Sequence, residues 1–306
     1  MNLTQEKETL FVPLLGKAEE SRRPNPILSD PKAEEIIKTV DYDFSKLRVP
    51  IQSRTTLAMR AKKLDDIVRA YLTSAPASPL VLHLGCGLDS RILRVGSPSV
   101  PWYDLDYPAV IELRRQFYAE TETYHMLGSS VTDYSWIDAV EPRLTPPSPP
   151  VPGGPWPPER SGVGEGGRGD DHGPRSEAER EGGRPAIIIA EGLLMYLRPE
   201  AVKELVLRLR DRFPGSDLAF DAFSTTTVRR ISRHPSIKKT GAEIHWGLDD
   251  PREIETWAPG IQLLEVWPFT LSPDVGKLGL GFRLIFRLMG AIPAAQKAHR
   301  VFRYRL

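Results

Sequence analysis

The chain has 306 residues, 40% of them hydrophobic and 26% charged, which is a balance typical of a globular protein with a sizeable core. Its 41 basic and 40 acidic residues give a net charge of +1, which disfavours a general binder of nucleic acid or of anionic membranes. The single cysteine, Cys86, excludes an intrachain disulfide and a zinc site built from cysteines, and no metal-ligand pattern stands out.

Apolar runs in the sequence are too short for a membrane span. The densest ones, at residues 186–190 and 278–289, fall short of the roughly 20 apolar residues required, and the second is broken by Arg283 and Arg287. The first residues of the sequence are too charged for a secretory signal. We therefore expect no membrane span and a cytoplasmic location.

Helix and strand patterns alternate along the chain. Apolar residues at helical spacing predict helices at residues 32–39, 56–72, 108–118 and 199–213. Short apolar runs predict strands at residues 79–84, 100–105, 124–127, 186–190, 217–222, 261–267 and 299–306. The run at 186–190 does not alternate, so it is expected to be buried on both faces. This order predicts an α/β fold with a mostly parallel sheet between helices.

Residues 142–184 form a compositional break in this pattern. They contain 10 prolines and 10 glycines among 43 residues, with few large apolar side chains. Such a segment cannot bury enough surface to offset the entropy cost of ordering. We predict a disordered insertion, and a proline-rich recognition segment is the alternative. Its role is left open.

The first predicted strand ends in a glycine turn that contains Gly85 and Gly87. Such a turn lets the backbone approach a ligand, although a plain tight turn is the alternative. Asp106 lies 19 residues after Gly87, at the end of the next strand, where its carboxylate can accept both ribose hydroxyl hydrogens. Asp104 lies two residues earlier and is the weaker candidate. Because Ser90 replaces the third glycine of the dinucleotide fingerprint, a nicotinamide-dependent oxidoreductase is disfavoured.

Polar residues also follow the third and fourth predicted strands. Asp133 is placed to accept a hydrogen from the adenine amino group, with Tyr134 beside it, or merely to cap the next turn. Glu191 comes directly after the buried run at 186–190. A buried carboxylate is costly unless it is paired, and this is more readily understood at a ligand site than in a core.

Three motifs together carry a resemblance to a known family. They are His-Leu-Gly-Cys-Gly-Leu-Asp-Ser-Arg at 83–91, Tyr-Asp-Leu-Asp-Tyr-Pro at 103–108 and Ala-Glu-Gly-Leu-Leu-Met-Tyr-Leu at 190–197. Over residues 54–223, without the insertion, the chain resembles the leucine carboxyl methyltransferase family, nearest to its tetracenomycin polyketide synthesis O-methyltransferase-like branch. The resemblance implies S-adenosyl-L-methionine as cofactor.

The same resemblance implies a fold and a division of the chain. The fold is the Rossmann-like class I methyltransferase fold, a seven-stranded, mostly parallel sheet whose last strand is antiparallel. The final two strands would form an antiparallel hairpin, and a lid would follow strand five. Residues 1–52 would be an N-terminal helical or lid extension, and residues 53–306 the methyltransferase domain, interrupted by the insertion at 142–184.

The resemblance also assigns roles to individual residues. Arg60 would hold the methionine carboxylate, although a helical arginine is otherwise usually solvated, and Glu191 would face the methionine amino group. The glycine turn would lie against the methionine and ribose, and Asp106 would take the ribose hydroxyls. Asp133 and Tyr134 would lie near the adenine. The cofactor-binding residues expected are thus Arg60, Gly85, Gly87, Asp106, Asp133, Tyr134 and Glu191.

The methyl acceptor is predicted to be a small acidic or phenolic aromatic molecule, methylated on oxygen in secondary metabolism. Residues 224–259 are the lid candidate, with apolar and basic side chains that could enclose or attract such a ring, or simply pack and face water. A carboxylate acceptor needs no base, whereas a phenol benefits from one. His245 is the tentative base, and a histidine with no catalytic role is the alternative.

Two other functions stay open at this point. Members of the family that act on proteins methylate a C-terminal carboxylate, but the lid that admits such a substrate is not recognisable here. A non-catalytic scaffold is the other alternative, although it would have no need of Gly85, Gly87, Asp106 and Glu191. The oligomeric state is likewise open.

Overall fold

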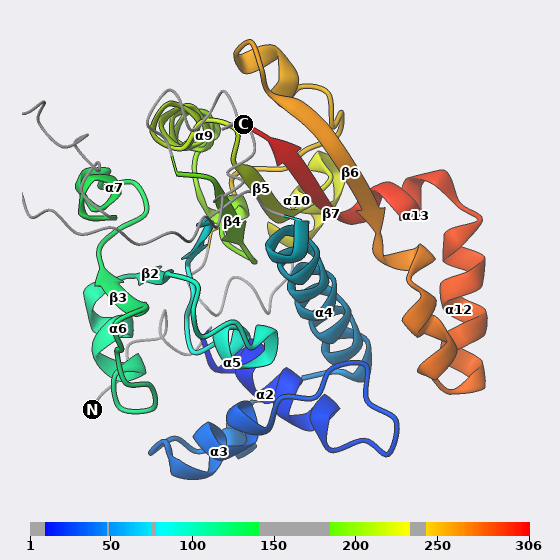
Figure 1. Cartoon of the computed structure of the whole chain (residues 1–306). Helices are drawn as coiled ribbons and strands as arrows, with labels where there is room; N and C mark the ends of the chain where they lie inside the picture. The colour runs from blue at the N-terminus through cyan, green and yellow to red at the C-terminus, as the bar shows by residue number, and fades with distance from the viewer. Residues whose placement is uncertain (1–9, 48, 75–77, 141–183, 233–242) are drawn as a thin grey trace, which may run out of the picture.

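The computed structural model describes residues 10–47, 49–74, 78–140, 184–232 and 243–306, and these form one seven-stranded sheet ordered β3-β2-β1-β4-β5-β7-β6 (Figure 1). The strands are β1 (Leu80–Leu84), β2 (Trp102–Asp106), β3 (Tyr124–Gly128), β4 (Ala186–Ala190), β5 (Asp217–Phe223), β6 (Gln262–Pro268) and β7 (His299–Arg305). β1 to β5 are parallel, and β7 is antiparallel to both β5 and β6. The predicted fold class is therefore confirmed.

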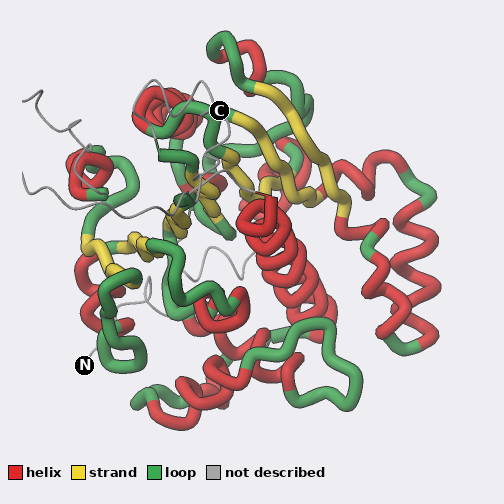
Figure 2. The backbone as a smooth tube through the Cα atoms, in the orientation of Figure 1, coloured by secondary structure: helices red, strands yellow, loops and turns green. Residues whose placement is uncertain are grey.

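Helices cover both faces of this sheet (Figure 2). On one face lie α4 (Ile51–Ser74), α5 (Arg91–Val95) and α6 (Pro108–Arg114), and on the other lie α7 (Ser135–Ala139) and α9 (Pro199–Arg212). The central strand β4 is buried on both sides, as its unbroken apolar run predicts. Ile187 and Ile189 pack toward α4, and Ile188 packs toward α9.

Two N-terminal helices precede the sheet. The predicted helix at 32–39 is present as α3 (Pro31–Thr39), with proline in its first turn and the Asp30 carboxylate accepting from the Ala33 N–H at 2.9 Å. The sequence did not predict α2 (Phe11–Ser21), whose apolar residues pack against α4. Because α4 begins at Ile51, the proposed division after residue 52 falls inside a helix, and it stays a prediction.

A long connection separates β6 from β7. The two strands pair antiparallel as expected, but they are not joined by a short turn. Between them lie η4 (Phe269–Leu271), η5 (Pro273–Lys277), α12 (Leu280–Gly290) and α13 (Pro293–Ala298). Since β6 is parallel to β1–β5, this connection lies at the edge of the sheet where the parallel strands end, the edge at which ligands bind in such folds.

The segment after β5 packs against the sheet where it is described. It contains α10 (Thr225–Ser232) and η3 (Ile254–Trp257). The Trp246 ring packs on Phe220 of β5, with their centroids 5.9 Å apart, and is buried in the core.

The predicted insertion at 142–184 lies outside the described residues except for Arg184. Within the described ranges, no helix has both the length and the apolar character needed to cross a bilayer. The same ranges hold no cluster of three or more histidine, cysteine, aspartate or glutamate residues suited to a metal ion.

Candidate functional site

The glycine turn and Asp106 form one hydrogen-bonded unit at the ends of β1 and β2. Gly85 and Gly87 have φ angles of +64° and +52°, a backbone region that side chains with a Cβ rarely adopt. The Gly87 N–H donates to Asp106 Oδ2 at 2.8 Å, and the Tyr107 N–H donates to Oδ1 at 2.7 Å. The turn thus holds the Asp106 carboxylate against its own backbone, at the spacing that the sequence analysis singled out.

Burial acts on the Asp106 carboxylate as well. It raises the pKa of Asp106 above its ordinary value, although the Gly87 and Tyr107 N–H groups stabilise the charged form. Each carboxylate oxygen has a second lone pair that these N–H groups leave free. Asp106 can therefore accept further hydrogen bonds from a ligand such as a ribose.

Glu191, directly after β4, is surrounded by three cationic side chains. Arg60 of α4 donates from Nε to Glu191 Oε1 at 3.0 Å, and Lys17 Nζ of α2 lies 3.5 Å from the same oxygen. Arg91 of α5 pairs with Oε2. Burial alone would raise the pKa of Glu191, but the charges of Lys17, Arg60 and Arg91 hold it well below its usual range. The buried carboxylate is therefore ionised.

Arg60 is a buried residue of this site, not a solvated one. Its second contact runs from NH1 to Asp221 Oδ2 on β5 at 3.1 Å. Asp221 also accepts from the Gly192 N–H at 2.6 Å and pairs with His299 Nε2 of β7 at 2.7 Å. Arg60 thus connects Glu191 at the end of β4 with the strands β5 and β7.

A second layer of charged residues lies beneath Glu191. Arg91 donates from Nε to Asp65 at 2.8 Å and contacts His83 Nε2 at 2.9 Å. His83 Nδ1 lies 3.2 Å from Asp104, which also pairs with Arg114. Burial and the Arg91 charge lower the pKa of His83 to about 4, so it is neutral at pH 7. Asp104 is therefore a structural partner of these buried side chains, and Asp106 is the carboxylate at the ligand-facing edge.

Ion pairs also fix the N-terminal helices over the glycine turn. Lys17 pairs with Asp89, which follows the turn. Arg94 of α5 contacts both Asp89, at 3.0 Å, and Asp30, the cap of α3, at 2.8 Å. Burial lowers the pKa of Lys17 to about 8. The N-terminal helices are therefore part of the site.

Asp133 and Tyr134 lie apart from these residues, on the loop that joins β3 to α7. The Asp133 carboxylate is exposed and accepts from the Ser135 hydroxyl at 2.9 Å, as a turn cap would. The guanidinium of Arg208 stacks over the Tyr134 ring at 4.2 Å. These contacts leave one side of the Asp133 carboxylate open, so its role toward adenine stays a prediction.

His245, the tentative base, lies on the lid candidate with no contact to Glu191 or Asp106. Its Nε2 is 3.5 Å from the exposed Glu243, and its backbone N–H donates to the Met195 carbonyl at 2.9 Å. Among the described residues, the His245 side chain therefore forms no hydrogen bond or ion pair with those that the sequence analysis assigned to the cofactor.

The sequence analysis did not single out Lys17, Arg91, Asp221 or His299, which the structure places around Glu191 and Arg60. A weak signal existed for Lys17, because it stands among buried apolar residues of α2. Asp221 likewise interrupts an otherwise apolar strand. Neither signal says which residues meet, since the partners lie far apart in the sequence.

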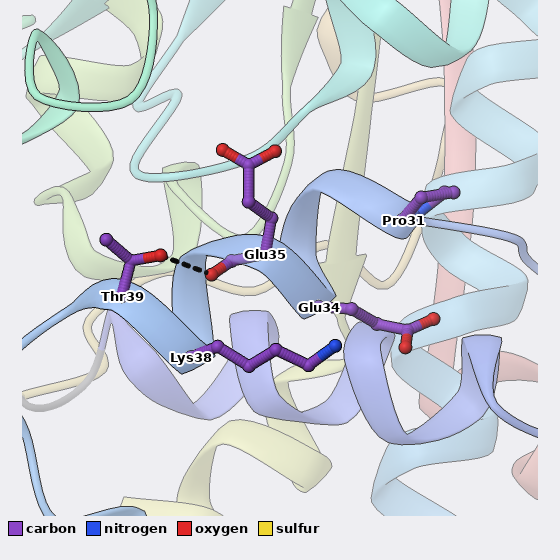
Figure 3. A pocket seen from close by; sticks show the side chains of 5 residues that line it. All are labelled: Pro31, Glu34, Glu35, Lys38 and Thr39. Carbon is purple, nitrogen blue, oxygen red and sulfur yellow. Dashed lines mark hydrogen bonds between the residues drawn. The ribbon is translucent and has the colours of Figure 1, made fainter.

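A shallow depression elsewhere on the surface has no part in this arrangement. It runs along α3 and is lined by Pro31, Glu34, Glu35, Lys38 and Thr39 (Figure 3). The Thr39 hydroxyl in it donates to the Glu35 carbonyl of the same helix, at 2.9 Å. None of the predicted site residues lines it, so we place the site at the ends of β1, β2 and β4.

Comparisons with known proteins identify the family of the chain. The family model of leucine carboxyl methyltransferase matches residues 11–125, which include the glycine turn and Asp106. The chain is 34% identical over 305 residues to the tetracenomycin polyketide synthesis O-methyltransferase TcmP of Streptomyces glaucescens, covering 99% of this chain and 98% of that protein. The chain belongs to the leucine carboxyl methyltransferase family.

Two further comparisons of this chain agree on its cofactor and its fold. It is 26% identical over 286 residues to the S-adenosyl-L-methionine-dependent methyltransferase dpfgK of Gibberella zeae, covering 87% of this chain and 83% of that one. The fold is shared with the crystal structure of a methyltransferase candidate from Thermobifida fusca, with a TM-score of 0.54, 18% identity and coverage of 96% and 94%. The chain is therefore an S-adenosyl-L-methionine-dependent methyltransferase with a class I fold.

Proposed function

We propose that this methyltransferase transfers the methyl group to an oxygen of a small acidic or phenolic aromatic molecule in secondary metabolism. The observation that carries the proposal is the 34% identity to TcmP over nearly the full length of both chains. TcmP is named as an O-methyltransferase of polyketide synthesis. Because the match includes β5 to β7 as well as the glycine turn, it covers the acceptor side of the fold and not the cofactor side alone.

The cofactor would be held by the residues that line the carboxyl ends of β1, β2 and β4. Gly85 and Gly87 would lie against its methionine and ribose, where a Cβ would obstruct the approach. Asp106 would accept the ribose hydroxyls, and Asp133 with Tyr134 would face the adenine. At the other end, Arg60 and Lys17 would bind the methionine carboxylate while Glu191 binds its amino group. These groups fit the charges of an amino-acid moiety.

The pairing around Glu191 supports this assignment on energetic grounds. A buried charge that loses its only partner costs several kcal/mol. Arg60 has two carboxylate partners, Glu191 and Asp221, and Glu191 has three cationic partners. A ligand carboxylate or amine can therefore enter this cluster by exchanging contacts, without leaving a protein charge buried alone.

The protein's contribution to the reaction is orientation and exclusion of water. When bound, S-adenosyl-L-methionine supplies an activated methyl group on its sulfonium. The acceptor oxygen must be held in line with that methyl group, and positioning of this kind contributes much of the rate acceleration in group transfer. Two partly buried rings, Phe223 at the end of β5 and Trp267 of β6, would provide an apolar wall for a flat acceptor. Phe269 is buried and supports Trp267 from behind.

The lid candidate, residues 224–259, offers fewer free aromatic rings to an acceptor than its sequence predicts. Trp246 is buried on Phe220, and Trp257 packs against the same core, so neither ring is free to stack on an acceptor. The basic side chains Arg229 and Arg230 of α10 lie near the end of β5 and could attract an anionic acceptor. Arg233, Lys238 and Lys239 lie outside the described residues.

A radiolabelled donor and a cell extract separated by size test the proposal. Label is expected in small molecules that organic solvent extracts. Mild base then separates the two kinds of oxygen, because methyl esters hydrolyse and aryl methyl ethers survive. Label confined to macromolecules would contradict the proposal and favour a protein C-terminal carboxylate, the acceptor that the family name suggests. Binding of the cofactor without any label would favour a non-catalytic scaffold.

A further inference from the structure

His299 occupies a position that the cofactor assignment leaves unexplained. It is the first residue of β7 and pairs with Phe223, the last residue of β5. It therefore lies at the edge where the parallel strands end, next to the Arg60–Glu191 pair. Its side chain is 14% exposed. The imidazole is thus enclosed but not fully buried.

The ring of His299 is held by aromatic neighbours and one carboxylate. It lies 4.1 Å from the Phe223 ring and stacks on Phe269 at 4.3 Å, measured between centroids. Trp267 in turn packs edge-on against Phe269. Phe269 is buried, whereas Phe223 and Trp267 are the partly buried rings proposed above as the apolar wall. Because Phe223 contacts His299, an acceptor on the Phe223 ring would lie beside the imidazole.

The contact with Asp221 fixes which nitrogen carries the proton. Asp221 is ionised, because although burial would raise its pKa, the Arg60 charge and the His299 contact lower it. A carboxylate only accepts hydrogen bonds, so His299 Nε2 must be the donor at 2.7 Å. Nδ1 then carries a lone pair and can accept a proton. No hydrogen bond to Nδ1 occurs within the described part of the chain.

The charges around His299 favour the neutral imidazole at physiological pH. Burial lowers the pKa of His299, and the nearby Arg60 of α4 lowers it further. Asp221 of β5 and Glu191 after β4 act in the opposite direction. The balance is a lowered pKa, so the base form is the populated one at pH 7.

We propose that His299 Nδ1 accepts the proton of a phenolic acceptor and that Asp221 acts as the positioning residue that orients the imidazole. The inference rests on the proposed O-methylation. The phenol O–H bond breaks and its proton goes to Nδ1, while the oxygen forms a bond to the methyl carbon. The sulfur–methyl bond breaks and its electron pair stays on sulfur. The resulting imidazolium is stabilised by the Asp221 carboxylate at Nε2.

His245 is the rival candidate for this role. It has an exposed glutamate, Glu243, as its charged neighbour, at 3.5 Å. Among the described residues, no buried carboxylate holds its ring as Asp221 holds that of His299. The two histidines make different predictions, because His299 packs against Phe223 of the apolar wall, whereas the charged neighbour of His245 is the exposed Glu243.

The test uses the full chain, with 1-naphthol and 1-naphthoic acid as paired phenolic and carboxylate probes. The variant His299→Gln keeps an N–H donor for Asp221 but has no base. It is expected to lower kcat for 1-naphthol about 10²- to 10⁴-fold at pH 7, with KM and cofactor affinity within about twofold. Its rate should rise about tenfold per pH unit as the phenol ionises. Methylation of 1-naphthoic acid should change little, since a carboxylate needs no base.

Two further variants complete the comparison. His125→Gln changes a partly exposed histidine on β3, at the far side of the sheet, and is expected to leave kcat unchanged. Asp221→Asn should lower kcat for 1-naphthol less than His299→Gln and shift the acid limb of the pH profile. Wild-type kcat for 1-naphthol in His299→Gln, or its loss in His245→Gln instead, would overturn the proposal.

A second measurement needs no acceptor and no turnover. Nitrogen-15 NMR of the imidazoles in the unliganded protein should show His299 neutral, with the proton on Nε2, at pH 7. A proton on Nδ1, or a charged ring, would overturn the proposal even if the phenol is methylated. Failure of the wild-type protein to bind S-adenosylhomocysteine in calorimetry would contradict the methyltransferase function itself, and so separates the two questions.

Discussion

Two neighbouring regions of the molecule differ in the side chains that they bury. Around Glu191, which follows β4, the buried side chains are charged. Around His299, at the end of β5 and the start of β7, aromatic rings pack on both sides of one imidazole. The first region suits a ligand with fixed charges, because each ligand charge finds a partner there. The second suits an apolar ring with one reactive oxygen. Cofactor chemistry thus demands particular residues, while acceptor chemistry demands mainly shape and one proton acceptor.

The largest effect is expected from Glu191→Gln, which removes the carboxylate shared by Lys17, Arg60 and Arg91. Leaving these buried cations short of a partner should lower the free energy of unfolding by about 3–5 kcal/mol and abolish cofactor binding. Chemical denaturation and calorimetry measure the two effects. Glu204→Gln, an exposed partner of Arg208 on α9, should change stability by less than about 0.5 kcal/mol. Equal free energies of unfolding for the two variants would show that Glu191 does not stabilise the buried cations around it.

Acid should weaken the layer of residues beneath Glu191 through His83. In the folded chain the pKa of His83 is about 4, and in the unfolded chain it is near the ordinary value of 6.5. The unfolded chain therefore binds more protons in this window, and stability falls as the pH falls from 6.5 toward 4, by about 3 kcal/mol in total.

Thermal unfolding between pH 6.5 and 5 measures this effect before most carboxylates titrate. His83→Asn should unfold at a lower temperature but with a smaller dependence on pH. If the variant keeps the full pH dependence of the wild type, His83 is not the group responsible.

A smaller effect is expected from Asp106→Ala, which tests the ribose contact. Charge-assisted hydrogen bonds contribute about 1.5–3 kcal/mol each, so affinity for S-adenosylhomocysteine should fall at least about tenfold in calorimetry. Asp211→Ala, which removes an exposed carboxylate on α9, should leave the affinity unchanged. Unaltered affinity in Asp106→Ala would remove this residue from the site.

The smallest effect is expected from Asp133. Its exposed carboxylate accepts a hydrogen bond from Ser135 in the turn, and it is also proposed to accept one from the adenine. Asp133→Ala should weaken cofactor binding by about fivefold if one hydrogen bond to adenine is lost. Ser135→Ala removes the partner of the turn cap and keeps the carboxylate, so it should leave affinity unchanged. Equal affinities in both variants would assign Asp133 to the turn alone.

Sequence reasoning identified residues that lie close together where their spacing in the chain is short. The strand–turn–strand spacing from Gly85 to Asp106 lies within one βαβ unit, so local spacing determined the contact that the structure shows. The strands of the sheet were also predictable, because buried parallel strands have unbroken apolar runs. Glu191 and Arg60 were singled out, and their pairing across 131 positions emerged only in the folded chain.

The remaining features depend on contacts that local patterns do not encode. Lys17 and Asp221 look like isolated charges in apolar elements until the fold brings their partners together. His299 is the first residue of the last strand, and it lies beside Asp221 because β7 pairs with β5. The helix α2 was missed because Pro13 and Gly16 weaken its helical pattern, while burial of its apolar residues against α4 stabilises it.

The strand order has a consequence for how the protein assembles during synthesis. β7 follows β6 in the chain but lies between β5 and β6 in the sheet. Until residues 299–305 have been made, β6 has no strand to join and the outer edge of β5 stays open. Unpaired strand edges are templates for aggregation, and contacts that wait for distant residues form late. The strand that is synthesised last, β7, is therefore the one that joins β6 to the rest of the sheet. We expect the nascent chain to be most prone to aggregation just before β7 emerges from the ribosome.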